Sequence, residues 1–433
     1  MITSTHAIAR ARVGARGLVA SLALLACGDS GGGTSDASTT TTGETAPATD
    51  ATTSAGSSSS TSEGDATTSE TTGAPAFECD FQGVDFDAGV PDLLSDMCLV
   101  RWTEQGFELA DNVYPYELNT VLFSDYALKQ RAIYIPPGAT AEYRDNEVLE
   151  LPVGSIILKS FIFPADLRAP ELAQDLIETR VLVRFPEEWK AYPYIWDHEL
   201  GDALLTVQGE IRPIEFIGLD GEPKLSTYLI PQKNQCQECH EIKDENDETV
   251  ITPIGPRPRY LNRDADFGDG PVNQLQRYAD AGWLTGVPPI AGIPKAWDHR
   301  ALADTPVADM SYAEVTTAAR DYLDINCAYC HNPRGVNGIS SQLFLNWDNE
   351  DVFHLGFCKK PGSAGKGGEN RDYDIVPGDA EASILIYRTE TLDLGSMMPL
   401  IGRSLAHEDG SALLRAWIDG LPPDDCSAPD PMP

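Results

Sequence analysis

The run IILKSFIF, Ile156 to Phe163, and the run TRVLVRF, Thr179 to Phe185, decide the fold class of this chain. Both have the length of a strand and are rich in β-branched and aromatic residues. Turn sequences such as PPG at Pro136–Gly138 and DG at Asp220–Gly221 separate runs of this kind. No helical period of comparable length intervenes. We therefore predict a β-rich part over residues 77–230, built as an antiparallel sandwich.

Helical patterns occur later in the chain. Ser311 and Glu314 form a capping box ahead of an apolar stripe at positions 315, 318, 319, 322 and 323. A second stripe begins at Leu413, and Gly420 and Pro422 mark its end. The sequence therefore predicts a multidomain chain, in which an all-β part precedes mainly α-helical segments.

Two short segments combine two cysteines and a histidine in the pattern C-x-x-C-H. They are CQECH at Cys236–His240 and CAYCH at Cys327–His331. On a helical turn the positions i, i+3 and i+4 share one face, so two thiols can join the vinyl groups of one haem while the imidazole reaches its iron. We predict two haem c groups per chain. The expected attachment points are Cys236, Cys239, Cys327 and Cys330, and the expected proximal ligands are His240 and His331.

Zinc and redox chemistry are the alternatives for the CxxC pairs. The two pairs lie much farther apart than the roughly 15–20 residues of a zinc ribbon, and each histidine follows its pair directly. Neither pair sits at the strand-to-helix turn of a βαβ unit, where a thioredoxin-like dithiol is found. Covalent haem is therefore the favoured interpretation.

The first residues have the character of a secretory leader, which we assign to residues 1–26. Three arginines and no acid precede a short apolar run that ends in Leu24-Leu25-Ala26-Cys27. This tetrapeptide, followed by Gly28, resembles a bacterial lipobox, which implies a lipid on Cys27. Plain secretion with Cys27 as an ordinary residue stays the alternative. Residues 27–76 are rich in Ser and Thr and predict a disordered tether.

The charge of the chain bears on its partners. The formal net charge of the 433 residues is −36, which disfavours nucleic acid and anionic bilayers as partners. We expect a redox partner protein with a basic docking surface. We also expect an exported protein anchored to the inner or outer membrane through its N-terminal lipid only, facing the periplasm or the cell surface.

Four cysteines belong to neither the CxxCH segments nor the lipobox. They are Cys79, Cys98, Cys358 and Cys426. In an oxidising compartment four such cysteines suggest two disulfides. Proximity along the chain favours pairing 79 with 98 and 358 with 426, although three connectivities are possible.

The segment Thr305–Asp424 has the order helix, CxxCH, loop, Met-Pro, helix, which resembles class I cytochrome c. The resemblance implies that Met398, which directly precedes Pro399, is the distal ligand of the second haem, in preference to Met397. The segment Pro253–Pro256 resembles the Gly-Pro of cytochromes c, which implies that the Pro256 carbonyl accepts the Nδ1 hydrogen of His240. The first haem has three candidate distal ligands and the further option of an open position. The candidates are Met310, His299 and His198.

A wider resemblance joins these features. The leader, LNTVLFSD at Leu118–Asp125, PYIW at Pro193–Trp196, the CxxCH segments and LNRD at Leu261–Asp264 are similar to a family of exported bacterial di-haem c-type cytochromes. The similarity covers roughly residues 79–421. It implies electron transfer. The domain organisation that we expect is a β-rich domain at 77–230, a first haem segment at 231–304, a class I cytochrome c-like domain at 305–424 and a tail at 425–433. His198 departs from the family, which more often has other polar residues there.

Two other function classes stay open. One is a di-haem peroxidase, in which the first haem keeps an open face. The other is a binding or assembly protein, in which the β-rich part does the work and the haems only relay electrons.

Overall fold

In the computed structural model, the described residues are Cys79, Phe81 and the ranges 83–103, 106–268, 270–336, 339–362 and 367–427. The predicted leader at 1–26, the lipid site Cys27 and the whole of the predicted tether at 27–76 lie outside these residues, and so does the part of the tail after Ser427. Among the described residues, no helix combines the length and the apolar character that a membrane span requires.

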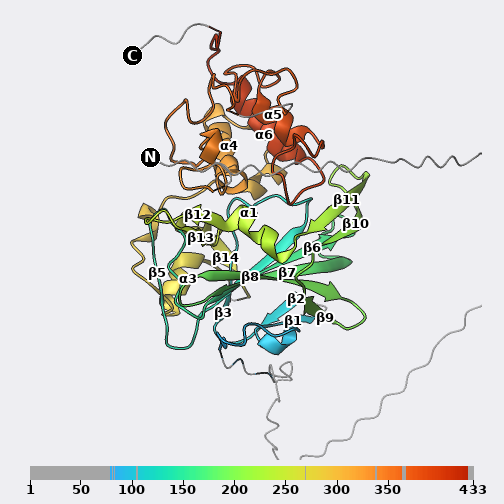
Figure 1. Cartoon of the computed structure of the whole chain (residues 1–433), viewed down its shortest axis with the longest axis vertical. Coiled ribbons are helices and arrows are strands. Elements are labelled where there is room, and N and C mark those ends of the chain that lie inside the picture. Colours follow the sequence, from blue (N-terminus) through green and yellow to red (C-terminus); the bar gives the residue numbers. More distant parts are fainter. Residues whose placement is uncertain are drawn as a thin grey trace, which may run out of the picture. The chain divides into compact units, whose positions relative to one another are not determined.

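The largest element of the fold is a six-stranded antiparallel sheet in the order β3-β4-β6-β7-β8-β9 (Figure 1). Its strands are β3 (Val113–Pro115), β4 (Leu128–Tyr134), β6 (Ile156–Pro164), β7 (Gln174–Arg184), β8 (Trp189–Asp197) and β9 (Asp202–Leu205). The two runs that decided the fold class in the sequence form the adjacent central strands β6 and β7. The predicted β-rich, antiparallel part is confirmed.

One face of this sheet packs on the first residues of the described chain. Alternate residues of the central strands, such as Ile156, Leu158, Val181 and Val183, share a hydrophobic cluster with Val100. The antiparallel pair β1 (Val100–Thr103) and β2 (Gly106–Leu109) lies against this cluster. Because side chains of a strand alternate between its faces, the intervening residues point to the opposite side of the sheet.

The opposite face is covered by later parts of the chain. At one end the hairpin of β10 (Glu210–Ile217) and β11 (Pro223–Ile230) packs Phe216 and Tyr228 on Phe163. At the other end Ile133 and Ile157 pack with residues from 260–296. A charged strip, described below, separates these two apolar clusters.

Short strands continue beyond residue 230. They form two antiparallel hairpins and one parallel two-residue pairing. Their bounds are β12 (Glu241–Lys243), β13 (Thr249–Ile251), β14 (Asp264–Asp266), β15 (Pro271–Asn273), and β16 (Leu284–Thr285), which pairs with β5 (Ala141–Glu142). The β-rich region therefore extends past residue 230, because strands of two or three residues are too short to show a period in the sequence.

The described residues include six α-helices. These are α1 (Cys236–His240), α2 (Pro258–Leu261), α3 (Gln274–Asp280), α4 (Tyr312–Asn326), α5 (Ile384–Glu390) and α6 (Glu408–Asp419). The predicted capping box of Ser311 and Glu314 begins α4, and Gly420 ends α6. The apolar stripes of α4 and α6 pack together in one cluster, which includes Leu323 and Trp417. Figure 1 shows these helices in orange and red.

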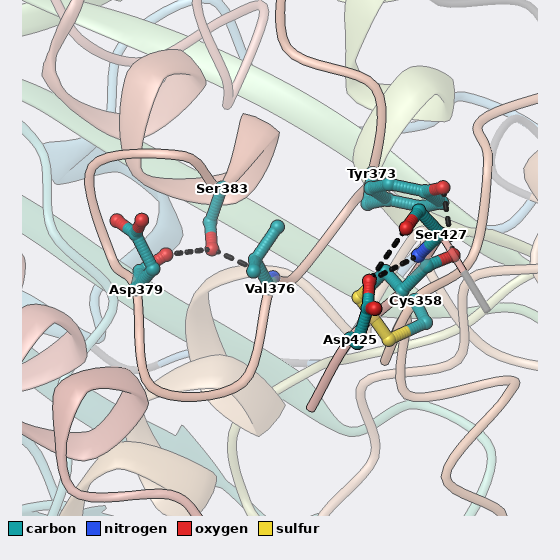
Figure 2. The surroundings of a disulfide bond; sticks show 8 residues. Cys358, Tyr373, Val376, Asp379, Ser383, Asp425 and Ser427 are labelled. Atoms are coloured by element: carbon teal, nitrogen blue, oxygen red, sulfur yellow. Dashed lines mark hydrogen bonds between the residues drawn. A yellow bond between two sulfur atoms is a disulfide. The ribbon is translucent and has the colours of Figure 1, made fainter. Parts of the chain in front are cut away.

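Two disulfides tie down the ends of the described chain. Cys79 pairs with Cys98, and Cys358 pairs with Cys426, which is the connectivity favoured from the sequence. Figure 2 shows the second disulfide, where the Tyr373 hydroxyl donates to the Cys426 carbonyl at 2.8 Å. The Cys358–Cys426 disulfide holds the segment after α6 against the loop that precedes α5.

Buried polar contacts join α4 to the earlier part of the chain. The guanidinium of Arg259 on α2 donates to Asp321 on α4 at 2.6 Å, and both side chains are almost fully buried. The Tyr260 hydroxyl donates to Asp324, one turn farther along α4. The backbone N–H of Phe123 donates to Asn326 at 2.7 Å. These contacts fix the start of the second CxxCH segment relative to the β-rich region.

Candidate functional site

The first CxxCH segment forms the whole of α1, directly after a 3-10 turn at Lys233–Gln235 that follows β11. The helical turn places Cys236, Cys239 and His240 at i, i+3 and i+4, on one face. Both cysteines are free thiols and half-buried. The local geometry is the one that thioether attachment and axial ligation need.

The ring of His240 is fixed by the hairpin that follows it. Its Nδ1 lies 2.7 Å from the carbonyl oxygen of Thr252, and the Thr252 N–H donates back to the His240 carbonyl at 2.8 Å. Because a carbonyl can only accept, Nδ1 carries the hydrogen and Nε2 keeps its lone pair free for a metal. Burial, with the charges of Lys159 and Arg180, lowers the pKa of His240 to about 4 even though Thr252 opposes the shift, so the ring is neutral near pH 7.

The predicted role of Pro256 is wrong. The acceptor for His240 is Thr252, while the Pro256 carbonyl accepts the Leu149 N–H at 3.0 Å. The reason is the register of the β12–β13 hairpin. This hairpin pairs Glu241 with Ile251, so the next residues in each direction, His240 and Thr252, face each other. Pro256 lies beyond this hairpin and turns toward the β-rich region.

The second CxxCH segment follows the last turn of α4. The carbonyl of Cys327 accepts the N–H groups of Cys330 at 3.1 Å and of His331 at 2.9 Å, which makes a single helical turn. The Nδ1 of His331 lies 3.2 Å from the Ser341 hydroxyl. Burial lowers the pKa of His331 to about 4, although a hydrogen bond from the ring to the backbone of Leu343 raises it. This imidazole is also neutral near pH 7.

The fold brings the two CxxCH segments into contact. The Cys330 thiol donates to the carbonyl of Glu238 at 3.3 Å. The Lys243 N–H donates to the Arg334 carbonyl at 2.8 Å, and Ile242 and Gly335 form an isolated β-bridge. A Cβ atom on Gly335 would overlap the Cys330 carbonyl, so glycine is required for this close approach. The sequence did not indicate that the segments adjoin.

A cavity of about 420 Å³ opens beside the second segment. Cys327, Cys330 and His331 line it, and so do Met398 and Pro399, which lie far away in the sequence. Met397 is not among the lining residues and is only 4 % exposed, in the protein interior. The volume falls in the range of roughly 300–1,000 Å³ that is typical of sites for small molecules and cofactors.

The thiols of both segments are held in their protonated form. Burial raises the pKa of Cys327 and of Cys330 to about 12. Burial also raises the pKa of Cys236 and of Cys239, although the charge of Arg180 opposes the shift at both. A reactive redox dithiol requires the opposite, a lowered pKa. The electrostatics therefore give no support to the dithiol alternative.

The three candidate distal ligands of the first haem lie in different places. His198 is largely exposed at the turn after β8, where its Nε2 lies 2.7 Å from Asp175. Met310 packs on the cluster of α4 and α6, a structural position. Both ring nitrogens of His299 are buried without a hydrogen-bond partner in the described structure. Of the two candidate histidines, only His299 has buried ring nitrogens that are free to bind a metal.

His299 shares its surroundings with His407, which the sequence reasoning did not identify. The centroids of the two rings are 6.3 Å apart. The Nδ1 of His407 lies 3.1 Å from the Tyr322 hydroxyl, and its ring stacks on Phe123 at 4.2 Å. Burial, with the charges of His299 and Lys129, lowers the pKa of His407 to about 3. A histidine just before the first turn of α6 was the only signal in the sequence.

The sheet face near the first segment carries a charged strip. Arg131 on β4 is directly opposite Lys159 on β6, and Lys159 is directly opposite Arg180 on β7. We call these three residues the cation row. Like charges on directly opposed side chains destabilise a sheet. Burial and then the charges of its two neighbours lower the pKa of Lys159 well below its usual value.

One member of the cation row could have been suspected from the sequence. Lys159 interrupts the apolar run IILKSFIF of a predicted strand. Charged residues at such positions are rarely buried without a partner. That the three would align across the sheet depends on strand register, which the sequence does not display.

No family model, curated protein or solved structure matches this chain. Within the described ranges, no group of three or more His, Cys, Asp or Glu side chains is placed to hold a metal ion. A c-type haem iron takes only one or two protein side chains, so it belongs to another kind of site. The resemblance to di-haem cytochromes therefore stays a prediction.

Proposed function

We propose that this protein is an exported di-haem c-type cytochrome that transfers electrons, with covalent haem at both CxxCH segments. A bound haem supplies an iron that alternates between the ferrous and ferric states. The observation that carries the proposal is the cavity lined by Cys327, Cys330, His331 and Met398. It combines the two thiols and the neutral imidazole of the second segment with a thioether, which are the side chains that a class I cytochrome c uses, and Cys239 of the first segment also lines it.

The finer features of the fold agree with this proposal. The helix α4 leads into the second CxxCH segment, the Met398-Pro399 loop follows, and α6 packs on α4, which is the element order of class I cytochrome c. We infer a cytochrome c-like unit here. We also infer a sandwich-like body for the β-rich part, since β1–β2 and β10–β11 cover opposite faces of the six-stranded sheet.

The ligand chemistry supports the assignment of both proximal histidines. Each ring has its Nδ1 next to a hydrogen-bonding partner, Thr252 for His240 and Ser341 for His331. Such a bond orients the ring and leaves Nε2 available to the iron. Both imidazoles are neutral near pH 7, as ligation requires.

Contact between the two CxxCH segments supports a function in electron transfer. Cys330 touches the backbone of Glu238, and the Tyr329 side chain hydrogen-bonds to Cys239. Two haems attached at these cysteines would be neighbours, so an electron could pass between them without leaving the protein. The net charge of −36 favours a basic redox partner, and we infer export and lipid attachment at Cys27 from the leader alone.

The proposal is tested on the full chain, expressed in cells that mature c-type cytochromes. The intact mass should exceed that of the processed polypeptide by two haem groups. The pyridine haemochrome spectrum should be that of haem held by two thioether bonds. A colourless protein with the mass of the unmodified polypeptide would refute the proposal, and a mass gain of one haem would refute it for one segment.

A further inference from the structure

The cation row lies on the sheet face near the first CxxCH segment. The charges of Lys159 and Arg180 both act on His240 and on Cys239, and the charge of Arg180 also acts on Cys236. The row is flanked by the apolar residues Ile133 and Ile157 on one side and by Phe161 on the other. Three cations therefore cross an otherwise apolar surface beside a predicted cofactor site.

Few carboxylates are available to neutralise the positive charge of the cation row. Glu178 is the nearest carboxylate, and it is already engaged by Arg180 at 2.6 Å and by the Tyr228 hydroxyl at 2.6 Å. Lys129 lies on the same face of β4, and burial with the charges of Lys159, Arg131 and Arg180 lowers its pKa well below the usual value. Arg180 is already paired with Glu178, whereas Arg131, which is buried, and Lys159, which is partly buried, have no ion pair among the described residues. Buried charges are normally paired, so these two cations call for an anionic ligand.

Two other carboxylates act on these cations and are also committed. Asp125 raises the pKa of Lys129, but it accepts hydrogen bonds from Ser226 and from the Ser404–Leu405 backbone. Glu117 raises the pKa of Arg131, but it forms ion pairs with Arg263 and Arg300. Neither is free to neutralise the row.

Hydrogen-bonding capacity in the row is also unused. Arg131 is only 9 % exposed, and its Nη2 is buried without a partner in the described structure. The ammonium group of Lys159 lies 4.9 Å from the centre of the Phe161 ring. Charged, buried donors of this kind match carboxylate oxygens well.

Haem chemistry provides the matching anion. Thioether bonds to Cys236 and Cys239 and ligation by His240 leave both propionate carboxylates of the porphyrin without a protein partner from the CxxCH segment. We propose that the cation row, Arg131, Lys159 and Arg180, binds the propionates of the haem attached at Cys236 and Cys239. This inference rests on the proposed function, because it requires a haem at the first segment.

The row has a second consequence for the same haem. Positive charges near an iron centre stabilise its reduced form, which carries one positive charge fewer. The midpoint potential of the first haem is therefore raised by the row. The second haem, which is attached on the other side of the contact between the segments, is affected less.

The test is a spectroelectrochemical titration of the full chain and of three variants. Lys159→Met removes the central charge and keeps the length of the side chain, while Lys159→Arg keeps the charge. Lys190→Met is the matched control, because Lys190 is on β8 of the same sheet and belongs to the opposite face, next to Phe185. The second haem, present in every variant, reports that the protein has folded.

We expect Lys159→Met to lower the midpoint potential of one haem, and Lys159→Arg and Lys190→Met to leave both potentials close to those of the unaltered protein. Loss of the first haem in Lys159→Met but not in Lys159→Arg would also support the inference. Unchanged potentials in Lys159→Met, with both haems attached, would overturn it and leave the proposed function standing. Absence of haem from the unaltered protein would instead overturn the proposed function.

The alternative occupant of the cation row is a free anion from solution, such as phosphate. The titration of the unaltered protein is therefore repeated in phosphate and in chloride buffers of equal ionic strength. Equal potentials in the two buffers support propionates as permanent occupants of the row. A midpoint potential of the first haem that follows the phosphate concentration would assign the row to an exchangeable anion and overturn the inference.

Discussion

The two CxxCH segments share one spacing but have opposite surroundings. The first is a short helix, α1, next to a sheet face that carries Arg131, Lys159 and Arg180. The second is a turn at the end of α4, beside a cavity lined mainly by apolar residues, with Met398 in its wall. The motif fixes how a haem is attached, whereas its surroundings fix what the iron experiences.

On the proposed function, this contrast teaches that the two haems are tuned by different means. Near the first segment the means is charge, from the cation row. Near the second it is the thioether of Met398, which raises the potential when it ligates the iron. If charge sets the potential of one haem and the distal ligand sets that of the other, a change near one segment should leave the potential of the other haem unchanged.

The largest expected effect comes from removing each cysteine pair. In the double variant Cys236→Ala/Cys239→Ala, we expect the loss of one haem and retention of the second, because each pair holds its own group. The variant Cys327→Ala/Cys330→Ala should show the reverse. Intact mass measures the number of haems in each. Loss of both haems from either variant would show that the segments are not independent.

Replacement of Met398 should change the second haem only. Met398→Ala removes a side chain that lines the cavity, so we expect the midpoint potential of one haem to fall by a sizeable part of the roughly 0.8 V that axial ligands span. Redox titration measures the shift.

Met397 provides the matched control for this variant. Because Met397 is buried outside the cavity, Met397→Ala should cost about 2–5 kcal/mol in the free energy of unfolding and leave both potentials unchanged. Chemical denaturation measures that cost. The opposite pattern, with the potential changed by Met397→Ala only, would move the ligand to Met397.

Replacement of His299 tests whether its free ring nitrogens reach a haem iron. Its two ring nitrogens are buried and unpartnered in the described structure, so we expect His299→Ala to convert one haem from a low-spin to a high-spin spectrum. His198→Ala, at an exposed site paired with Asp175, should leave the spectrum unchanged. His407→Ala is tested in parallel, because the two rings adjoin. A first haem that is high-spin before any substitution would instead favour the open face of a peroxidase.

The smallest effect on the haems is expected from the ion pair that joins α2 to α4. Asp321→Asn removes the nearer counter-charge of the buried Arg259 guanidinium and leaves Asp324 at 3.9 Å, so we expect a loss of about 3–5 kcal/mol in the free energy of unfolding. Asp309→Asn, at an exposed position just before α4, should change stability by less than about 0.5 kcal/mol. Equal costs in the two variants would mean that this ion pair does not hold α4 in place.

Local patterns in the sequence predicted local structure well. The capping box at Ser311 and the stripe that follows it predicted α4, and the runs at 156–163 and 179–185 predicted the strands β6 and β7. In each case the decisive contacts lie within one turn or one strand, so a short window of sequence contains them.

Features that depend on contacts between distant segments were not predictable in the same way. Pro256 was chosen by resemblance, whereas the register of the β12–β13 hairpin gives the bond to Thr252. The cation row depends on the pairing of three strands, and the His299–His407 pair joins two loops far apart in the chain. The five residues of a CxxCH motif contain no information about the cation row or about the His299–His407 pair.

The central claim is that one chain holds two haems in unlike surroundings, and a potentiometric titration of the unaltered full chain tests it most directly. We predict two one-electron steps at separate potentials, of which Lys159→Met moves one and Met398→Ala moves the other. A single step that both variants shift together, or a protein with no redox-active haem, would contradict the account.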